Sequence, residues 1–312
     1  MSRFNELLQF TPIYQTRVWG GRRLETVLGR RLPDGQPYGE SWDLVDRGPE
    51  QSVVAVGASA GVSLHDLWTS RRAEVFGEAF VAVTSERFPL LIKVLDCTDD
   101  LSLQVHPPVD VAPALGGEPK TEMWFVAHAD DRARIYAGLK AGVTREHFES
   151  ALRDGTVASC VSTLEAHTGD SLFVPSGRLH ALGGGLLIYE IQQNSDTTYR
   201  VFDWNRMGLD GKPRTLHVAE SLRSIDFSDV TPSLSHGAGV LAECPYFRVT
   251  RARTGHETPR GRFRLIMPIC ATFWGGKTLA PGALTLCPAS LELPGPSGEW
   301  LEIEMMSGIV SH

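Results

Sequence analysis

Short apolar segments separated by glycine and proline run through the whole chain, and they restrict its fold more than any other feature. The 312 residues include 31 glycines and 19 prolines, which are spread over the full length. Between them lie short runs rich in Val, Ile, Leu, Phe and Trp, which are typical of β-sandwiches and β-barrels. The best strand candidates are residues 90–95, 123–127, 171–174, 186–192, 247–251 and 284–287. The sequence therefore predicts a mainly β protein.

Helical signals are few and local. Ser63 has a side chain suited to an N-cap, and it precedes a helical stretch that ends at about residue 76, before Gly77. Thr144 can cap a second helix over residues 145–153, in which the apolar positions follow a helical period. We expect a third helix at about residues 216–224. Helices are thus predicted to be a minor part of the fold.

The length and a local change in composition predict two domains. A chain of 312 residues can form two modest domains or one large β domain. The segment after residue 227 is rich in Ser, Pro and Gly, which is typical of a linker. We therefore predict a larger domain with helical segments over residues 1–228, a linker over residues 229–239 and a smaller β domain over residues 240–312.

Charge and cysteine usage restrict the partners and the location of the protein. The formal net charge is −7, and basic residues gather only in short pairs such as Arg22-Arg23, which favours neither nucleic acid nor a membrane surface. No stretch approaches the roughly 18 apolar residues of a membrane helix. The five cysteines are odd in number and form no C-x-x-C pair, which is typical of reduced thiols. We expect a cytoplasmic protein without a nucleic-acid or membrane partner.

Three segments concentrate side chains that can bind a metal ion. They contain Gln104 with His106, Lys120 with Glu122, and His180. Side chains two residues apart in a strand face the same way, so the members of each pair are expected to share a face. Two imidazoles, a carboxylate and an amide oxygen suit a divalent ion, zinc above all. A histidine in a β-rich protein is more often structural than metal-binding, and spacing alone leaves both interpretations open.

The strand candidate at residues 186–192 carries polar groups on one of its faces. Glu190 and Gln192 alternate with apolar residues, and a buried acid or amide is unfavourable without a polar ligand or partner. Further along, Arg200 and Arg206 carry permanent charges suited to oxyanions. The polar face of this strand is therefore expected to meet a ligand or a polar partner.

Several blocks of the sequence resemble those of class I mannose-6-phosphate isomerases of the short bacterial type. Four blocks are similar to that family's signatures: QVHP (104–107), KTEMW (120–124), PSGRLHALGGG (175–185) and EIQQNSDTTYRVFDWNR (190–206). Three more are similar to its N-terminal blocks: WGG (19–21), GESW (39–42) and FPLLIK (88–93). The blocks keep their order over nearly the whole chain. The resemblance implies a cupin jelly-roll β-barrel with a few helices in the larger domain and a degenerate cupin-like β domain after it.

The resemblance also implies a set of site residues. As ligands of one Zn(2+) per chain it implies Gln104, His106, Glu122 and His180. As catalytic residues it implies Arg200 and Lys120, and as substrate-binding residues it implies Lys93, Ser102, Glu190 and Arg206.

The activity implied by the resemblance is the interconversion of mannose 6-phosphate and fructose 6-phosphate. Such a reaction moves a proton between C1 and C2 through an enediolate, whose charge a metal ion and Arg200 would stabilise. Lys120, a water molecule on the metal, or Glu190 could be the general base, and the sequence leaves all three open. The alternative function is a non-catalytic cupin that binds sugars or metal. Such a protein would need no proton-transfer group, whereas this chain has Lys120 and Arg200 beside the ligand set.

Overall fold

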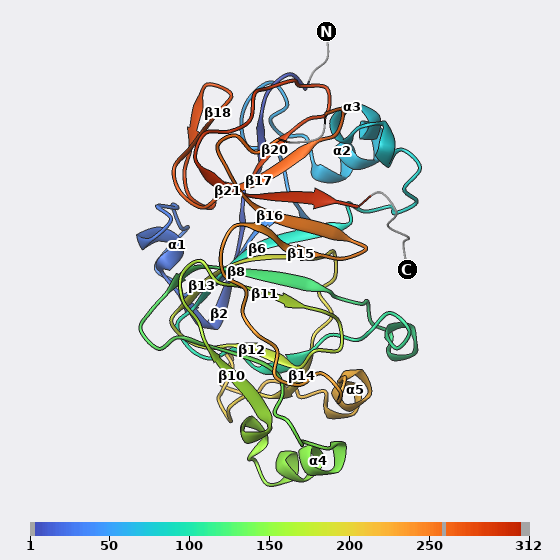
Figure 1. Ribbon diagram of the computed structural model, residues 1–312, viewed down its shortest axis with the longest axis vertical. Coiled ribbons are helices and arrows are strands. Elements are labelled where there is room, and N and C mark those ends of the chain that lie inside the picture. Colours follow the sequence, from blue (N-terminus) through green and yellow to red (C-terminus); the bar gives the residue numbers. More distant parts are fainter. Residues whose placement is uncertain (1–3, 258–259, 307–312) are drawn as a thin grey trace.

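The structure is a computed structural model that describes residues 4–257 and 260–306. Strands dominate it, and they form three large sheets with short helices at the periphery (Figure 1). The predicted mainly β class is therefore confirmed. Among the described residues, no helix is both long enough and apolar enough to span a membrane.

Two of the large sheets enclose the candidate site. The first has the strand order β11-β8-β13-β6-β3-β2, and the second, below it in Figure 1, has the order β10-β9-β12-β7-β14. The strands of the first sheet are β2 (Ile13–Gly21), β3 (Tyr38–Leu44), β6 (Leu90–Cys97), β8 (Glu122–Ala129), β11 (Ser171–Val174) and β13 (Leu186–Gln193). Those of the second are β7 (Leu103–Val105), β9 (Arg134–Leu139), β10 (Val161–Glu165), β12 (His180–Leu182) and β14 (Tyr199–Phe202).

The third sheet contains the C-terminal strands and one short N-terminal strand. Its order is β1-β20-β17-β21-β16-β15. The strands are β1 (Leu8–Gln9), β15 (Gly239–Glu243), β16 (Phe247–Arg253), β17 (Arg264–Pro268), β20 (Thr285–Cys287) and β21 (Glu299–Met305). Two small hairpins complete the strands: β4 (Asp46–Arg47) with β5 (Glu50–Gln51), and β18 (Thr272–Trp274) with β19 (Lys277–Leu279). All six strand candidates overlap observed strands.

The helices begin where local capping signals place them. Ser63 Oγ accepts a hydrogen bond of 3.0 Å from the Asp66 amide, and Thr144 Oγ1 accepts one of 3.2 Å from the His147 amide. The first predicted helix is divided in two at Arg71, whose φ of −133° and ψ of 24° are not helical. The helices are α1 (Arg23–Thr26), α2 (Leu64–Ser70), α3 (Arg72–Phe76), α4 (Arg145–Arg153) and α5 (Val218–Ser224), with 3₁₀ turns η1 (Glu78–Phe80), η2 (Ala112–Leu115) and η3 (Val157–Cys160).

The largest hydrophobic cluster joins the two ends of the chain. It contains Phe4 from the N-terminus, Tyr189 from β13 and Leu301 from β21, all of which are buried. The strand β1 pairs with β20 in the third sheet, so that Leu8 faces Leu286. N-terminal residues therefore belong to the same sheet as the C-terminal strands.

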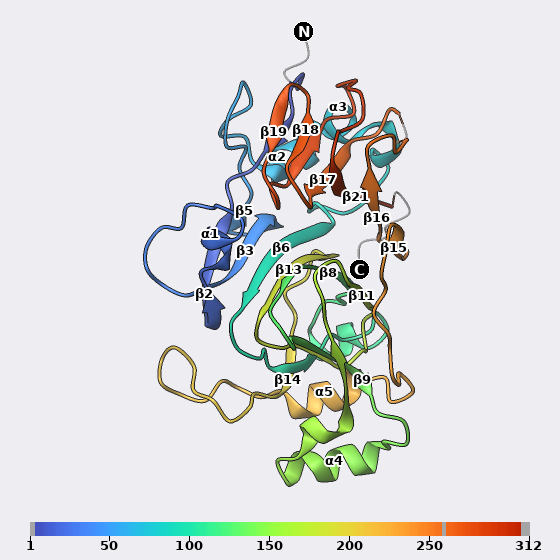
Figure 2. The same ribbon diagram turned by 60° about the vertical axis from the view of Figure 1, so that its left-hand side comes forward.

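The predicted linker packs against the first two sheets. From α5 it runs past β11 to β15 (Figure 2). Val230 forms an isolated bridge with Leu139, and Ser235 forms one with Ser171. The domain boundaries at residues 228 and 240 stay a prediction.

Candidate active site

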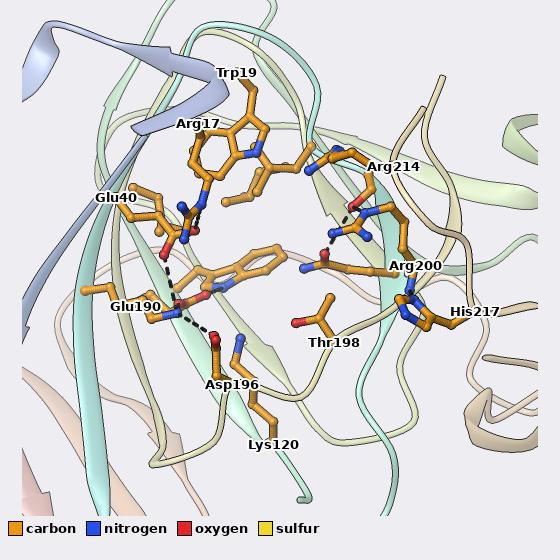
Figure 3. Close-up of a pocket in the computed structure, with 17 residues that line it drawn as sticks. Arg17, Trp19, Glu40, Lys120, Glu190, Asp196, Thr198, Arg200, Arg214 and His217 are labelled. Atoms are coloured by element: carbon orange, nitrogen blue, oxygen red, sulfur yellow. Dashed lines mark hydrogen bonds and ion pairs between the residues drawn. The ribbon is translucent and has the colours of Figure 1, made fainter. Parts of the chain in front are cut away.

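A cavity of about 340 Å³ opens between the first and second sheets. Its lining is mostly polar, and the labelled side chains in Figure 3 converge on it from both sheets. Six of the ten predicted site residues line it: Lys93, Ser102, Gln104, Lys120, Glu190 and Arg200. The cavity therefore brings together side chains from segments that lie far apart in the sequence.

The remaining predicted metal ligands lie next to this cavity in a fully buried cluster. The ligand atoms of His106, Glu122 and His180 all lie within 4.8 Å of one another. His106 Nε2 is 3.5 Å from Glu122 Oε2, and His180 Nε2 is 3.5 Å from Glu122 Oε1. Each imidazole therefore faces a different oxygen of the Glu122 carboxylate.

Backbone carbonyls orient both imidazoles. His106 Nδ1 lies 2.8 Å from the carbonyl oxygen of Thr197, and His180 Nδ1 lies 2.8 Å from that of Arg178. A nitrogen that faces a carbonyl must carry the proton, so the lone pair of each ring is on Nε2, facing Glu122. Burial lowers the pKa of His106, and it lowers the pKa of His180 to about 3. Both rings are therefore neutral, as metal ligands must be.

The cluster fits a divalent metal ion. His106 Nε2 and both carboxylate oxygens of Glu122 are buried without a hydrogen-bond partner, whereas buried polar atoms normally have one. Lys120 Nζ lies 2.8 Å from Glu122 Oε2, but this contact is an ion pair without hydrogen-bond geometry. Two imidazole nitrogens and a carboxylate form a common donor set for zinc and related ions. These three residues can therefore hold a metal.

Gln104 and Lys120 connect the cluster to the cavity. Gln104 Nε2 lies 3.4 Å from His180 Nε2, and rotating its amide by half a turn would direct Oε1 at the cluster. Burial alone would lower the pKa of Lys120, but the negative charges of Glu122 and Glu190 outweigh it and raise this pKa above its usual value. Lys120 is therefore an ammonium in the metal-free protein.

One wall of the cavity is acidic and surrounds Lys93. Lys93 Nζ lies 3.6 Å from Glu40, 3.9 Å from Glu190 and 3.7 Å from Asp196. Glu190 Oε1 also accepts a hydrogen bond of 3.1 Å from Trp124 Nε1. Burial raises the pKa of Glu190 to about 7. The charge of Lys93 is thus neutralised locally, and Glu190 can exchange a proton near neutral pH.

The opposite wall is cationic. Arg200 donates from Nε to Ser102 Oγ at 3.1 Å and from Nη1 to the Thr215 carbonyl at 3.0 Å. Within the described part of the chain, no carboxylate lies close enough to Arg200 to form an ion pair, so neither Asp196 nor Asp203 braces it. Its charge is therefore available to a ligand.

Two cationic or titratable residues of this wall were not anticipated from the sequence. Arg214 lines the cavity and pairs with Asp203 at 2.6 Å. His217 also lines it, and its Nδ1 accepts a hydrogen bond of 3.3 Å from the Arg200 amide, while its own amide donates to the Arg200 carbonyl at 2.7 Å. These two contacts with Arg200 bring His217 to the cavity wall after an intervening loop. No local sequence pattern predicts them.

Arg206 is the one predicted site residue that belongs neither to the cavity lining nor to the buried cluster beside it. Its guanidinium pairs with Asp203 at 2.9 Å and with Asp99 at 3.1 Å. Glu40, Trp124 and Asp196 line the cavity although the sequence assigned them no role.

Comparison with known proteins identifies the family of the chain. Residues 7–117 match the family described as phosphomannose isomerase type I, catalytic domain. The probable mannose-6-phosphate isomerase GmuF of Bacillus subtilis is 39% identical over 313 residues, which cover 96% of this chain and 97% of the relative. The chain belongs to the type I phosphomannose isomerase family. A second family member, mannose-6-phosphate isomerase ManA of the same organism, is 36% identical over 254 residues, 78% of each chain.

Two solved structures share this fold. The crystal structure of the mannose 6-phosphate isomerase from Bacillus subtilis matches with a TM-score of 0.83 and 28% identity, covering 96% of this chain and 99% of that one. A putative mannosephosphate isomerase from Archaeoglobus fulgidus has the same fold at 22% identity, with a TM-score of 0.74 over 96% and 97% of the two chains. The predicted cupin-type fold is thus confirmed.

Proposed function

We propose that this chain interconverts mannose 6-phosphate and fructose 6-phosphate with one zinc ion per chain. The observation that carries the proposal is the buried cluster of His106, Glu122 and His180 beside a polar cavity that also holds Glu190 and Arg200. The volume of the cavity, about 340 Å³, lies within the usual range for small-molecule sites. Family membership favours this enzyme over a non-catalytic cupin, because the curated relatives are named as mannose-6-phosphate isomerases.

The metal ligands in this proposal are His106, Glu122 and His180, with Gln104 as a fourth donor through Oε1. Two neutral imidazoles that face Glu122 through Nε2, and a carboxylate whose oxygens have no hydrogen-bond partner, support this assignment. A bound zinc ion supplies Lewis-acid stabilisation of the negative charge that develops on a substrate oxygen.

Glu190 is the general base in this proposal. The isomerisation requires a group that takes the proton from one of the two carbons, C1 or C2, and returns it to the other. A carboxyl group with a pKa of about 7 can do both at neutral pH, because its charged and protonated forms are similar in free energy. The Trp124 indole and Lys93 fix the orientation of the carboxylate.

Arg200 stabilises the enediolate in this proposal. Its Nε donates to Ser102 Oγ, and this hydroxyl lies 3.3 Å from the side-chain amide of Gln104, which borders the cluster. A fixed cation without a carboxylate partner favours the state in which charge has moved onto oxygen. Lys120 and Ser102 are further donors to the sugar oxygens.

We assign the substrate phosphate to Arg214 and His217 rather than to Lys93 or Arg206. Lys93 is surrounded by three carboxylates, and Arg206 does not line the cavity. His217 accepts at Nδ1, so in its neutral form the proton is on Nε2, which can donate to an anion. The cationic wall is therefore the favourable side for a dianion.

An isomerase assay before and after chelation tests the function. We expect the purified protein to convert mannose 6-phosphate to fructose 6-phosphate, to lose this activity with its metal, and to regain it with zinc. A folded, zinc-loaded preparation that converts neither sugar phosphate into the other would contradict the proposal.

A further inference from the structure

The orientation of the proposed metal ligand His180 depends on a residue two positions before it. His180 Nδ1 lies 2.8 Å from the carbonyl oxygen of Arg178. The ring is completely buried, and its other nitrogen lies 3.5 Å from Glu122. Any shift of this carbonyl would therefore turn the ring and move Nε2 away from the cluster.

The side chain of Arg178 is held in place by Asp229. Arg178 Nε donates to Asp229 Oδ2 at 2.8 Å, and Nη2 donates to Asp229 Oδ1 at 2.7 Å. The guanidinium also donates from Nη1 to the Phe173 carbonyl at 2.6 Å. Both charged side chains are only 16% exposed, so the bidentate pair is stronger than an ordinary surface ion pair.

Asp229 is itself fixed by backbone contacts at the start of the predicted linker. The Asp229 carbonyl accepts a hydrogen bond of 2.9 Å from the Leu139 amide, and the Thr231 amide donates to the Leu139 carbonyl at 3.0 Å. Just before it, the Asp226 amide donates to the Gly177 carbonyl at 2.9 Å. Residues 226–231 therefore contact the turn that leads into His180 in two ways: through the backbone amide of Asp226 and through the side chain of Asp229.

We propose that Asp229 is a positioning residue for the metal site, acting through Arg178 on the orientation of His180. The inference rests on the proposed metal site. It assigns to the segment that joins α5 to β15 a role in metal affinity, although Asp229 touches neither the cluster nor the cavity. Outer partners of metal ligands typically change metal affinity by about 10–100-fold, and we expect about tenfold because Asp229 acts through an intermediate residue.

Zinc affinity is the quantity to measure, by competition with a chromophoric chelator and without any sugar phosphate. Asp229→Asn keeps the size of the side chain but removes its charge, and Arg178→Gln removes the partner. Each variant should raise the zinc Kd about tenfold. The double variant should bind no more weakly than the weaker single variant, because both changes break the same connection.

A matched control comes from an arginine–carboxylate pair in the third sheet, to which none of the cluster residues belongs. Arg251 Nε lies 2.8 Å from Glu299 Oε1 in the third sheet, and Glu299→Gln should leave the zinc Kd unchanged. The melting temperature of each protein without metal separates a local effect from general loss of stability. If Asp229→Asn does not fold, Arg178→Lys, which keeps the charge but loses the planar fork, should still weaken zinc binding.

Two results would overturn the inference. One is a wild-type zinc Kd in folded Asp229→Asn, or in folded Arg178→Lys if the former does not fold. The other is additive losses in the double variant, which would mean that Asp229 does not act through Arg178. The zinc Kd is measured without substrate, so this test does not depend on the reaction. An absence of isomerase activity in the wild-type protein would therefore count against the proposed reaction but not against this inference.

Discussion

Glu190 and Trp124 face each other across β13 and β8, and the Trp124 indole donates a hydrogen bond of 3.1 Å to Glu190 Oε1. This contact fixes a buried carboxylate at the cavity wall. A base held in one orientation needs little rearrangement before proton transfer, which is why we assign this role to Glu190.

The pH dependence of turnover follows from the raised pKa of Glu190, about 7. Below this pH the carboxyl group is protonated and cannot take a proton from carbon, so kcat should fall as the pH decreases through about 7. Glu190→Gln, which can still accept from Trp124, should lower kcat by about 10²–10⁴-fold. Rate measurements from pH 5 to 9 check both points. If the residual activity of Glu190→Gln still falls with decreasing pH in the same way, another group is responsible for the pH dependence.

Removal of a metal ligand should abolish metal binding and turnover together. His180→Ala should reduce bound metal well below one ion per chain, as measured by elemental analysis. His147, an exposed residue on α4, provides the control, since His147→Ala should keep full metal content and activity. Full metal content in His180→Ala would refute the ligand assignment.

Arg200→Ala should reduce kcat by about 10²-fold or more, by analogy with the loss of one oxyanion donor. Substrate affinity and metal content should change much less, because the benefit of Arg200 arises in the transition state. Lys at this position should restore only part of the rate, because an ammonium lacks the planar fork. A near-normal kcat together with a lower melting temperature would show that Arg200 only braces its loop.

The phosphate assignment predicts different effects for two arginines that share one carboxylate. Arg214 and Arg206 both pair with Asp203, but only Arg214 lines the cavity. Arg214→Ala should raise KM for mannose 6-phosphate more than it lowers kcat, whereas Arg206→Ala should leave both constants near their wild-type values. Steady-state kinetics on the two variants make this comparison, and the reverse pattern would assign the phosphate to Arg206 instead.

The negative charge of Glu40 should stabilise the folded protein at neutral pH, and this contribution should be lost in strong acid. Burial opposes its charge, but Lys93 and Arg17 outweigh burial and lower the pKa of Glu40 to about 2. A carboxyl with a lowered folded-state pKa stabilises the protein above its unfolded pKa of about 4.3, and this contribution is lost as the pH falls towards 2. Glu40→Gln should therefore be less stable at pH 7, and the difference in melting temperature should shrink between about pH 4 and pH 2. A difference that is independent of pH would mean that Glu40 acts by packing alone.

Local sequence signals were sufficient for the fold class and for most elements. Glycine and proline separate the apolar runs, and the six strand candidates all overlap observed strands. Ser63 and Thr144 cap helices as predicted, because an N-cap needs only a side chain and an amide three residues away. The break at Arg71 was missed, since nothing in the apolar pattern marks it.

Of the ten site residues that the resemblance implied, nine lie at the cavity or in the cluster beside it. The family blocks did not indicate which of the charged side chains are paired with carboxylates. Lys93 was predicted to bind substrate, but three carboxylates from separate strands and loops surround it. The resemblance singled out Arg206, whereas Arg214, which lines the cavity, lies outside every family block.

The sequence by itself determined the β architecture, the helix caps and the residue types of the proposed metal site, because these depend on neighbours in the chain or on the chemistry of each side chain. Only the tertiary structure decided which arginine faces the cavity and which residue supports His180. Those outcomes depend on contacts such as Asp203 with Arg214, or Asp229 with Arg178, between segments that no local pattern connects. The free energy of a charge in a cavity is set by every group around it, and that set exists only after the chain has folded.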